Sequence, residues 1–254
     1  MSADQPEFLR ATRESYDAIA AEYTARFADG LAVLPLERGL LAAFAELARA
    51  AAPAGAAPPP VADLGSGPGY VTARLHDLGL PVFGVDLSPR MVALARRAHP
   101  GLRFHVGTMT SLDLPDATLG GIVALYSVIH VPDGHLAALF AEFHRVLVPG
   151  APVLLAFQSG DEDERAHVAE RFGHAVSLDC HWRTPETVTG HLRKGGLDVT
   201  ARVLRAPGPG ETRPRALLLA RRPPADPDGG PDGGPDCGDG TGTGRADGAG
   251  THGG

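Results

Sequence analysis

Residues 61–70 read Val-Ala-Asp-Leu-Gly-Ser-Gly-Pro-Gly-Tyr, a short apolar run followed by glycines at every second position. Glycine has no Cβ, so a loop with this spacing can turn sharply and bring its backbone close to a ligand. A helix that begins after such a loop presents its free N–H groups to the same place. The stretch therefore predicts a strand, a ligand-binding loop and a helix, in that order.

The spacing of the glycines separates two classes of cofactor. A dinucleotide-binding loop has the pattern Gly-x-Gly-x-x-Gly, whereas here Gly69 comes one residue early and Tyr70 occupies the last position. Asp63 lies two residues before the first glycine, Gly65. With this arrangement the stretch resembles motif I of the class I S-adenosylmethionine-dependent methyltransferases. A nicotinamide-dependent oxidoreductase remains the alternative for the loop.

Strand and helix patterns alternate from this loop onward. Strands are expected at 61–64, 81–86, 102–106, 121–126, 152–157, 197–204 and 216–220, with helices between most of them. Such alternation predicts an α/β fold with a doubly wound sheet. The last two strands have no helix between them and should pair antiparallel. A Rossmann-like seven-stranded sheet, mostly parallel with a C-terminal antiparallel hairpin, again resembles the class I methyltransferases.

Three further segments flank or interrupt this core. Tyr16, Ile19, Ala20, Tyr23 and Phe27 recur at helical spacing, and a second apolar stripe follows Pro35. These helices predict an N-terminal helical cap over residues 1–52, before a methyltransferase core at 53–222. The charge run 161–164 predicts a solvated helix start, and the segment 172–183 predicts an acceptor lid. Trp182 in this lid fits an acceptor wall and a packing anchor equally well.

The composition limits the remaining function classes. Residues 223–254 contain almost only Gly, Pro, Asp, Thr and Ala and carry about −5 of the formal charge of −7, so we expect a disordered tail. Lys194 is the only lysine, and no basic stripe indicates nucleic-acid binding. No signal peptide or long apolar run is found, which predicts a cytoplasmic protein that does not enter membranes. Neither the two cysteines nor the histidines predict a metal site.

Two carboxylates are the strongest candidates for ligand binding, because ligands of open α/β sheets bind at the carboxyl ends of the strands. Asp86 closes the second strand about 20 residues after the loop, where a carboxylate accepts from both hydroxyls of a ribose. Helix capping is the alternative role for Asp86. For Asp63 the alternative is that its carboxylate ties down the amides of the glycine loop.

The resemblance implies S-adenosyl-L-methionine as cofactor and suggests roles for further residues. It implies that Asp63 anchors the amino group of the donor, that Gly65, Gly67 and Gly69 approach it, and that Leu87 and Met91 pack on its adenine. Many relatives have an acidic residue where this chain has Thr108, so recognition of adenine is expected to depend on Met109 as well.

Tyr126 to His130 follow the fourth strand, and the resemblance places this segment between donor and acceptor. His130 could serve as general base, because the ordinary pKa of histidine is near neutrality; packing in an apolar stretch is the alternative. The resemblance also implies that Tyr23 folds over the donor.

These observations predict methyl transfer to an O, N or C nucleophile of a small-molecule acceptor. A donor-binding protein of the same fold that transfers no methyl group, such as a cyclase, is the second hypothesis.

Overall fold

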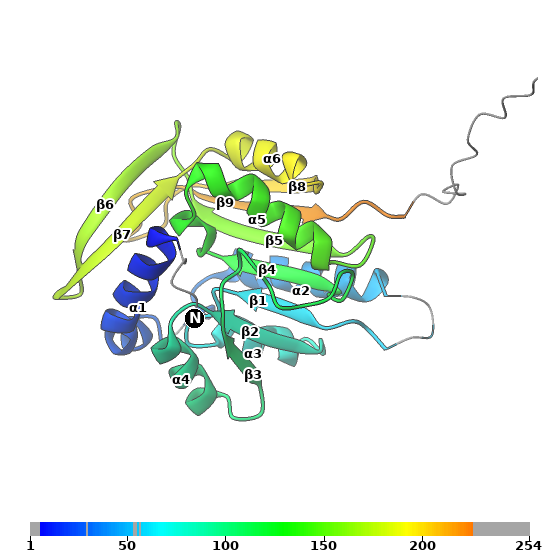
Figure 1. Cartoon of the computed structure of the whole chain (residues 1–254), viewed down its shortest axis with the longest axis horizontal. Coiled ribbons are helices and arrows are strands. Elements are labelled where there is room, and N and C mark those ends of the chain that lie inside the picture. The colour runs from blue at the N-terminus through cyan, green and yellow to red at the C-terminus, as the bar shows by residue number, and fades with distance from the viewer. Residues whose placement is uncertain (1–5, 29, 53–54, 56, 226–254) are drawn as a thin grey trace, which may run out of the picture. The chain divides into compact units, whose positions relative to one another are not determined.

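The computed structural model describes residues 6–28, 30–52, 55 and 57–225, and in these residues seven strands form one sheet in the order β3-β2-β1-β4-β5-β9-β8 (Figure 1). The strands are β1 (Val61–Leu64), β2 (Val82–Asp86), β3 (Arg103–Val106), β4 (Gly121–Leu125), β5 (Pro152–Gln158), β8 (Asp198–Arg205) and β9 (Arg215–Arg221). The first five pair in parallel, and β9 runs antiparallel to both β5 and β8. The predicted fold is confirmed. Residues 226–254 of the predicted tail, with Cys237, lie outside the described residues.

Helices cover both faces of the sheet. Helices α2 (Pro35–Ala50) and α3 (Tyr70–Asp77) pack on one face, and α5 (Asp133–Val146) and α6 (Pro185–Lys194) pack on the other. Neighbouring strand residues serve opposite faces: Val123 packs with α2 and α3, whereas Ile122 packs with α5. This double coverage explains why the central strands are apolar without alternation. Helix α4 (Pro89–Ala98) packs against Phe104 of β3.

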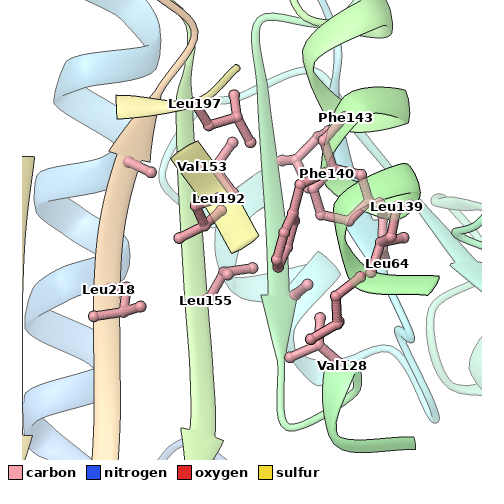
Figure 2. Packing of buried hydrophobic residues seen from close by; sticks show 14 of the residues in the cluster. Leu64, Val128, Leu139, Phe140, Phe143, Val153, Leu155, Leu192, Leu197 and Leu218 are labelled. Atoms are coloured by element: carbon pink, nitrogen blue, oxygen red, sulfur yellow. The ribbon is translucent and has the colours of Figure 1, made fainter. Parts of the chain in front are cut away.

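The larger core lies between the sheet and helices α5 and α6 (Figure 2). Phe140 and Phe143 of α5 are fully buried and meet edge to face, with ring centroids 5.8 Å apart. They pack in one cluster with Val153 and Leu155 of β5. This core fixes the carboxyl ends of the strands, where the site lies.

Helix α1 (Glu7–Arg26) begins well before the stripe that starts at Tyr16. Its extra turns carry Leu9, which is buried. The helix packs against α4 and against strand β7 (His174–Trp182), so it spans the carboxyl edge of the sheet.

The helix start predicted for the charge run at 161–164 was wrong, because a β-hairpin follows it. The segment 172–183, for which an acceptor lid is predicted, forms the turn and second strand of this hairpin. Strands β6 (Glu164–Arg171) and β7 pair antiparallel (Figure 1). Phe172 and Gly173 form the turn, with φ of 55° and 80°, which suits a tight hairpin. The charge run at 161–164 leads into β6, whose charged side chains are exposed on the open face of the hairpin. Charge alone did not distinguish a solvated strand from a solvated helix.

Trp182 is a packing anchor of this hairpin. The guanidinium carbon of Arg213 lies 3.8 Å from the centre of its ring, and Arg213 also binds Glu164 at 2.8 Å. Trp182 does not line the cavity described below. Of its two predicted roles, the structure therefore supports attachment of the hairpin to the body.

Candidate functional site

A cavity lies at the carboxyl ends of β1, β2 and β4, below helix α1. It contains about 1110 Å³ of empty space, part of it continuous with solvent. The predicted site residues that line it are Tyr23, Asp63, Gly65, Gly67, Asp86, Leu87, Met91, Thr108, Met109, Tyr126 and His130. The fold thus brings residues from five separate segments to one place. Only Gly69 of the predicted set does not line the cavity.

The glycine loop is held by its neighbour strand and leaves space for a ligand. The N–H groups of Gly65 and Ser66 both donate to the carbonyl of Val85, at 2.8 and 3.1 Å. Gly65 has φ of 78°, and a Cβ there would lie 2.3 Å from Cβ of Ser127. Gly67 has φ of 51°, but a Cβ there would meet nothing within 4 Å. Gly65 therefore lets the glycine loop approach the segment of Ser127, whereas Gly67 leaves open space next to the loop.

Gly69 has a different role from the other two glycines. It is the N-cap of α3, with φ of 93°, and a Cβ there would lie 2.8 Å from the ring of Phe104. The residue therefore fits the turn into the helix and the packing below it, rather than a direct approach to a ligand.

Asp63 is a buried carboxylate that binds the side chain of Thr72. Its Oδ2 accepts from the hydroxyl of Thr72 at 2.6 Å, and the residue is 2% exposed. Burial raises the pKa of Asp63 to about 7; the bond from Thr72 opposes this rise, and the charge of Asp86 adds to it. Asp63 thus binds Thr72 of α3, whereas the loop amide of Gly67 donates to Asp86.

Asp86 is the carboxylate that ties the loop down. It accepts from the N–H of Gly67 at 2.7 Å and from the N–H of Ser88 at 2.8 Å. Ser88, not Asp86, caps α4, because its hydroxyl accepts from the N–H of Met91. Burial raises the pKa of Asp86 to about 6, against the two backbone donors. Each carboxylate oxygen has a second lone pair available for a ligand hydroxyl.

His130 is oriented by hydrogen bonds on both ring nitrogens. Its Nδ1 lies 2.9 Å from the carbonyl of Asp179 in β7, and its Nε2 lies 2.8 Å from the hydroxyl of Tyr16. A carbonyl only accepts, so Nδ1 carries the proton and Nε2 accepts from Tyr16. Burial lowers the pKa of His130 to about 4, so the ring is neutral above pH 5. Arg183 supports the 3-10 helix η1 (Val128–His130) by donating to the carbonyl of Val131 at 2.5 Å.

Tyr126 leaves strand β4 in a backbone conformation that is rare for a residue with a side chain. Its φ is 57°, and its hydroxyl donates to Glu37 at 2.8 Å. Glu37 is only 1% exposed and lies in the first turn of α2. Strain of this kind is concentrated at functional sites. The bond to Glu37 fixes the ring of Tyr126 in the cavity wall.

Known proteins share this combination of fold and loop. The family described as "Methyltransferase domain" matches residues 61–150. The demethylmenaquinone methyltransferase of Chlorobaculum parvum is 37% identical over 93 residues, which are 36% of this chain and 38% of that protein. Residues 61–150 therefore match a methyltransferase domain. The chain spans about two fifths of the length of the curated relatives that it matches.

Solved structures share the fold of this chain at low sequence identity. The glycopeptide N-methyltransferase MtfA in complex with S-adenosyl-L-methionine superposes with a TM-score of 0.55 at 20% identity, covering 71% of this chain and 94% of that one. The [4+2]-cyclase SpnF superposes with a TM-score of 0.63 at 16% identity, covering 86% and 98%. At these identities the comparison shows the common fold.

The charge of the cavity restricts its ligand. Asp63 and Asp86 line the cavity, and no Lys or Arg is among the described lining residues. The hydroxyl of Ser66 is buried without a hydrogen-bond partner within the described structure. A cationic ligand with additional polar groups fits this wall, because it would neutralise the carboxylates and satisfy the hydroxyl. A pyrophosphate would add negative charge to the same space.

Thr108 and Tyr23 both line the cavity and both already contact other residues of the protein. The hydroxyl of Thr108 lies 2.8 Å from that of Thr110 and accepts from the N–H of Thr110 at 3.2 Å. A contact of Thr108 with adenine would therefore have to share this hydroxyl. Tyr23 packs edge to face with Tyr16, at 5.9 Å between ring centroids.

Several lining residues were missed from the sequence. Helix α1 contributes Leu9, Thr12 and Tyr16 in addition to Tyr23, all on one face, and Tyr70 contributes its ring from the start of α3. The helical spacing of the α1 residues continues the predicted stripe toward the N-terminus and could have revealed them. Leu31 and Leu34 come from the loop before α2 and have no such signal.

The described residues contain neither a membrane-spanning helix nor a cluster of metal ligands. No helix there has the length and apolar character needed to cross a bilayer. No group of three or more His, Cys, Asp or Glu side chains in the same part of the chain is placed to hold a metal ion.

Proposed function

We propose that this chain transfers the methyl group of S-adenosyl-L-methionine to an O, N or C nucleophile of a small-molecule acceptor, in the cytoplasm. The observation that carries the proposal is the cavity with two carboxylates, a glycine loop and no lining Lys or Arg among the described residues. The donor carries a sulfonium and an ammonium, so its charge is complementary to this wall. The dinucleotide alternative lacks this complementarity.

Each part of the donor has a candidate contact. Asp63 would bind the ammonium group, and Asp86 would accept from the ribose hydroxyls with its remaining lone pairs. Leu87 and Met91 would pack on adenine. The bound donor supplies an activated methyl group, so the protein mainly has to align the acceptor and exclude water.

Calorimetry with S-adenosylhomocysteine and NADH tests this assignment. We expect S-adenosylhomocysteine to bind with a stoichiometry of one and NADH to show no binding, because only the first is without a pyrophosphate. Binding of NADH alone would contradict the proposal. Release of labelled methyl groups to candidate acceptors then separates a methyltransferase from a donor-binding protein such as a cyclase, which would bind the donor without consuming it.

His130 is proposed as the proton acceptor through Tyr16, because its unprotonated Nε2 accepts from the hydroxyl of Tyr16. That hydroxyl lines the cavity and can take the proton of the acceptor as it passes its own proton to Nε2. The substitution His130→Gln is expected to slow methyl transfer by about 10²-fold, a typical loss when a general base is removed. Binding of S-adenosylhomocysteine should stay within about threefold of the wild type. Since the pKa of His130 is about 4, the wild-type rate should show no inflection from this ring between pH 6 and 8.

Transfer assays with labelled donor and an acceptor found in the screen measure this effect. If the variant transfers methyl groups at the wild-type rate, His130 is a packing residue and the acceptor loses its proton to water.

A further inference from the structure

Helix α1 forms the cover of the cavity. Its lining residues lie on one helical face; they are Phe8, Leu9, Thr12, Tyr16 and Tyr23. Because the helix crosses the carboxyl edge of the sheet, its position determines how much of a bound donor is shielded from solvent. The contacts that hold α1 in this position therefore contribute to ligand binding.

Three consecutive residues connect α1 to three different elements. The hydroxyl of Ser15 accepts from the N–H of Ser177 in β7 at 2.9 Å, and Tyr16 donates to His130 in η1. Asp17 accepts from the hydroxyl of Ser88 at 2.5 Å and from the N–H of Arg90 at 3.1 Å, at the start of α4. Consecutive residues point about 100° apart on a helix, so one turn of α1 is fixed on three sides.

The contact of Asp17 is also connected to the proposed donor contact. Ser88 donates its N–H to Asp86 and its hydroxyl to Asp17. Asp86 in turn accepts from Gly67 of the glycine loop. A continuous chain of hydrogen bonds thus joins the loop, the predicted ribose contact and the cover helix, so occupancy of the site and the position of α1 are expected to influence each other.

Other contacts of α1 contribute less. Glu22 pairs with His174 at 3.3 Å, with side chains 45% and 39% exposed, and Glu14 pairs with Arg10 of the same helix. Exposed pairs of this kind stabilise little. The bonds of Ser15 and Tyr16 and the bond from Ser88 to Asp17 are partly buried, whereas the bond from Arg90 to Asp17 is exposed.

We propose that Ser15, Tyr16 and Asp17 are positioning residues that hold α1 over the cavity and thereby set the rate at which the donor and its demethylated product leave. This inference rests on the proposed function. It predicts that breaking the bond to α4 speeds release while the chemical groups that touch the donor stay in place.

The substitution Asp17→Ala tests the inference with S-adenosylhomocysteine as probe. We expect the dissociation rate of S-adenosylhomocysteine, followed by surface plasmon resonance, to rise about tenfold. This is the effect of losing the hydrogen bonds that Asp17 accepts from Ser88 and Arg90. Asp17→Asn keeps an acceptor oxygen and should restore most of the slow release. Glu14→Ala removes an equal charge from the same helix and serves as the matched control, with an unchanged dissociation rate.

Hydrogen exchange provides a second readout that separates positioning from general loss of structure. In Asp17→Ala, exchange should increase in residues 12–22 and at Arg90, whose N–H loses its acceptor, and stay unchanged in the rest of α4 and in the sheet. Ser15→Ala, which breaks only the bond to β7, should also speed release. Equal dissociation rates for wild type, Asp17→Ala and Ser15→Ala would overturn the inference. Failure of S-adenosylhomocysteine to bind the wild type would instead overturn the proposed function on which it rests.

Discussion

Replacing Asp63 with asparagine is expected to stabilise the ligand-free protein at pH 8 and to weaken donor binding about 10- to 100-fold. Asp63 is 2% exposed and no Lys or Arg lines its cavity within the described residues. At pH 8 its buried charge therefore lacks a cation until the ammonium of the donor arrives. Asparagine removes the charge and keeps an oxygen that can accept from Thr72. The lost charge-assisted contact accounts for the weaker binding.

The effect on stability has a definite dependence on pH. The pKa of Asp63 is raised to about 7 in the folded state, above its ordinary value of 3.8. For a raised pKa, the favourable contribution is present below the unfolded value and is lost as the pH rises toward 7. Asp63→Asn should therefore match the wild type near pH 4 and exceed its free energy of unfolding at pH 8 by about 1–3 kcal/mol.

Denaturant unfolding at several pH values and calorimetry with S-adenosylhomocysteine measure the two effects. In the wild type, affinity should fall as the pH is lowered from 8 to 6.5, because Asp63 becomes protonated, and in the variant this fall should disappear. Asp113→Asn, at an exposed position, is the control and should change neither quantity. A variant that binds as tightly as the wild type at pH 8 would remove Asp63 from the donor site.

Gly65→Ala is expected to destabilise the protein by at least about 3 kcal/mol, because left-handed strain and a close contact act together. The φ of Gly65 is 78°, and the new Cβ would lie 2.3 Å from Cβ of Ser127. Relief of that contact requires the glycine loop to separate from the segment that carries Tyr126 and His130. Thermal unfolding should show a melting temperature lower by about 6–12 °C.

Gly67→Ala is the matched control for this effect. Its φ of 51° brings comparable backbone strain, but the new Cβ meets no atom within 4 Å. The variant should therefore lose only about 1–2 kcal/mol from strain. Its methyl group would occupy space left for the ligand, so binding of S-adenosylhomocysteine should weaken. Equal melting temperatures for the two variants would show that the approach of the loop to Ser127 is not close in solution.

The sheet and its binding edge could be predicted because their signals are local. The apolar runs, the glycine spacing at 65–69 and an acidic residue at the end of β2 are all set within a few neighbouring positions. Parallel pairing then follows from general rules of chain connection. The first strand of the hairpin, β6, was missed because it is charged and mostly exposed. In β7, Val176, Leu178 and Cys180 alternate with polar residues, and this strand pattern could have revealed the hairpin.

The different roles of the two carboxylates could be assigned only once the pairing of the strands was known. The sequence placed Asp63 next to the loop and Asp86 far from it, yet Asp86 is the one that holds Gly67. In the sheet, Leu64 pairs with Val85, so the end of β2 lies directly beside the loop. Asp63 instead points to Thr72 in α3.

By itself, the sequence determined the α/β sheet, the loop at 61–70 and eleven of the residues that line the cavity, because backbone preferences and apolar patterns act over short distances. Only the tertiary structure decided the protonation of Asp63 and Asp86, the orientation of His130 by Asp179 and Tyr16, and the attachment of α1 through Ser15 and Asp17. Burial and hydrogen bonding join residues that are up to 162 positions apart, as in the contact of Ser177 with Ser15. No local pattern specifies such pairs, since they form only when the strands and helices have packed.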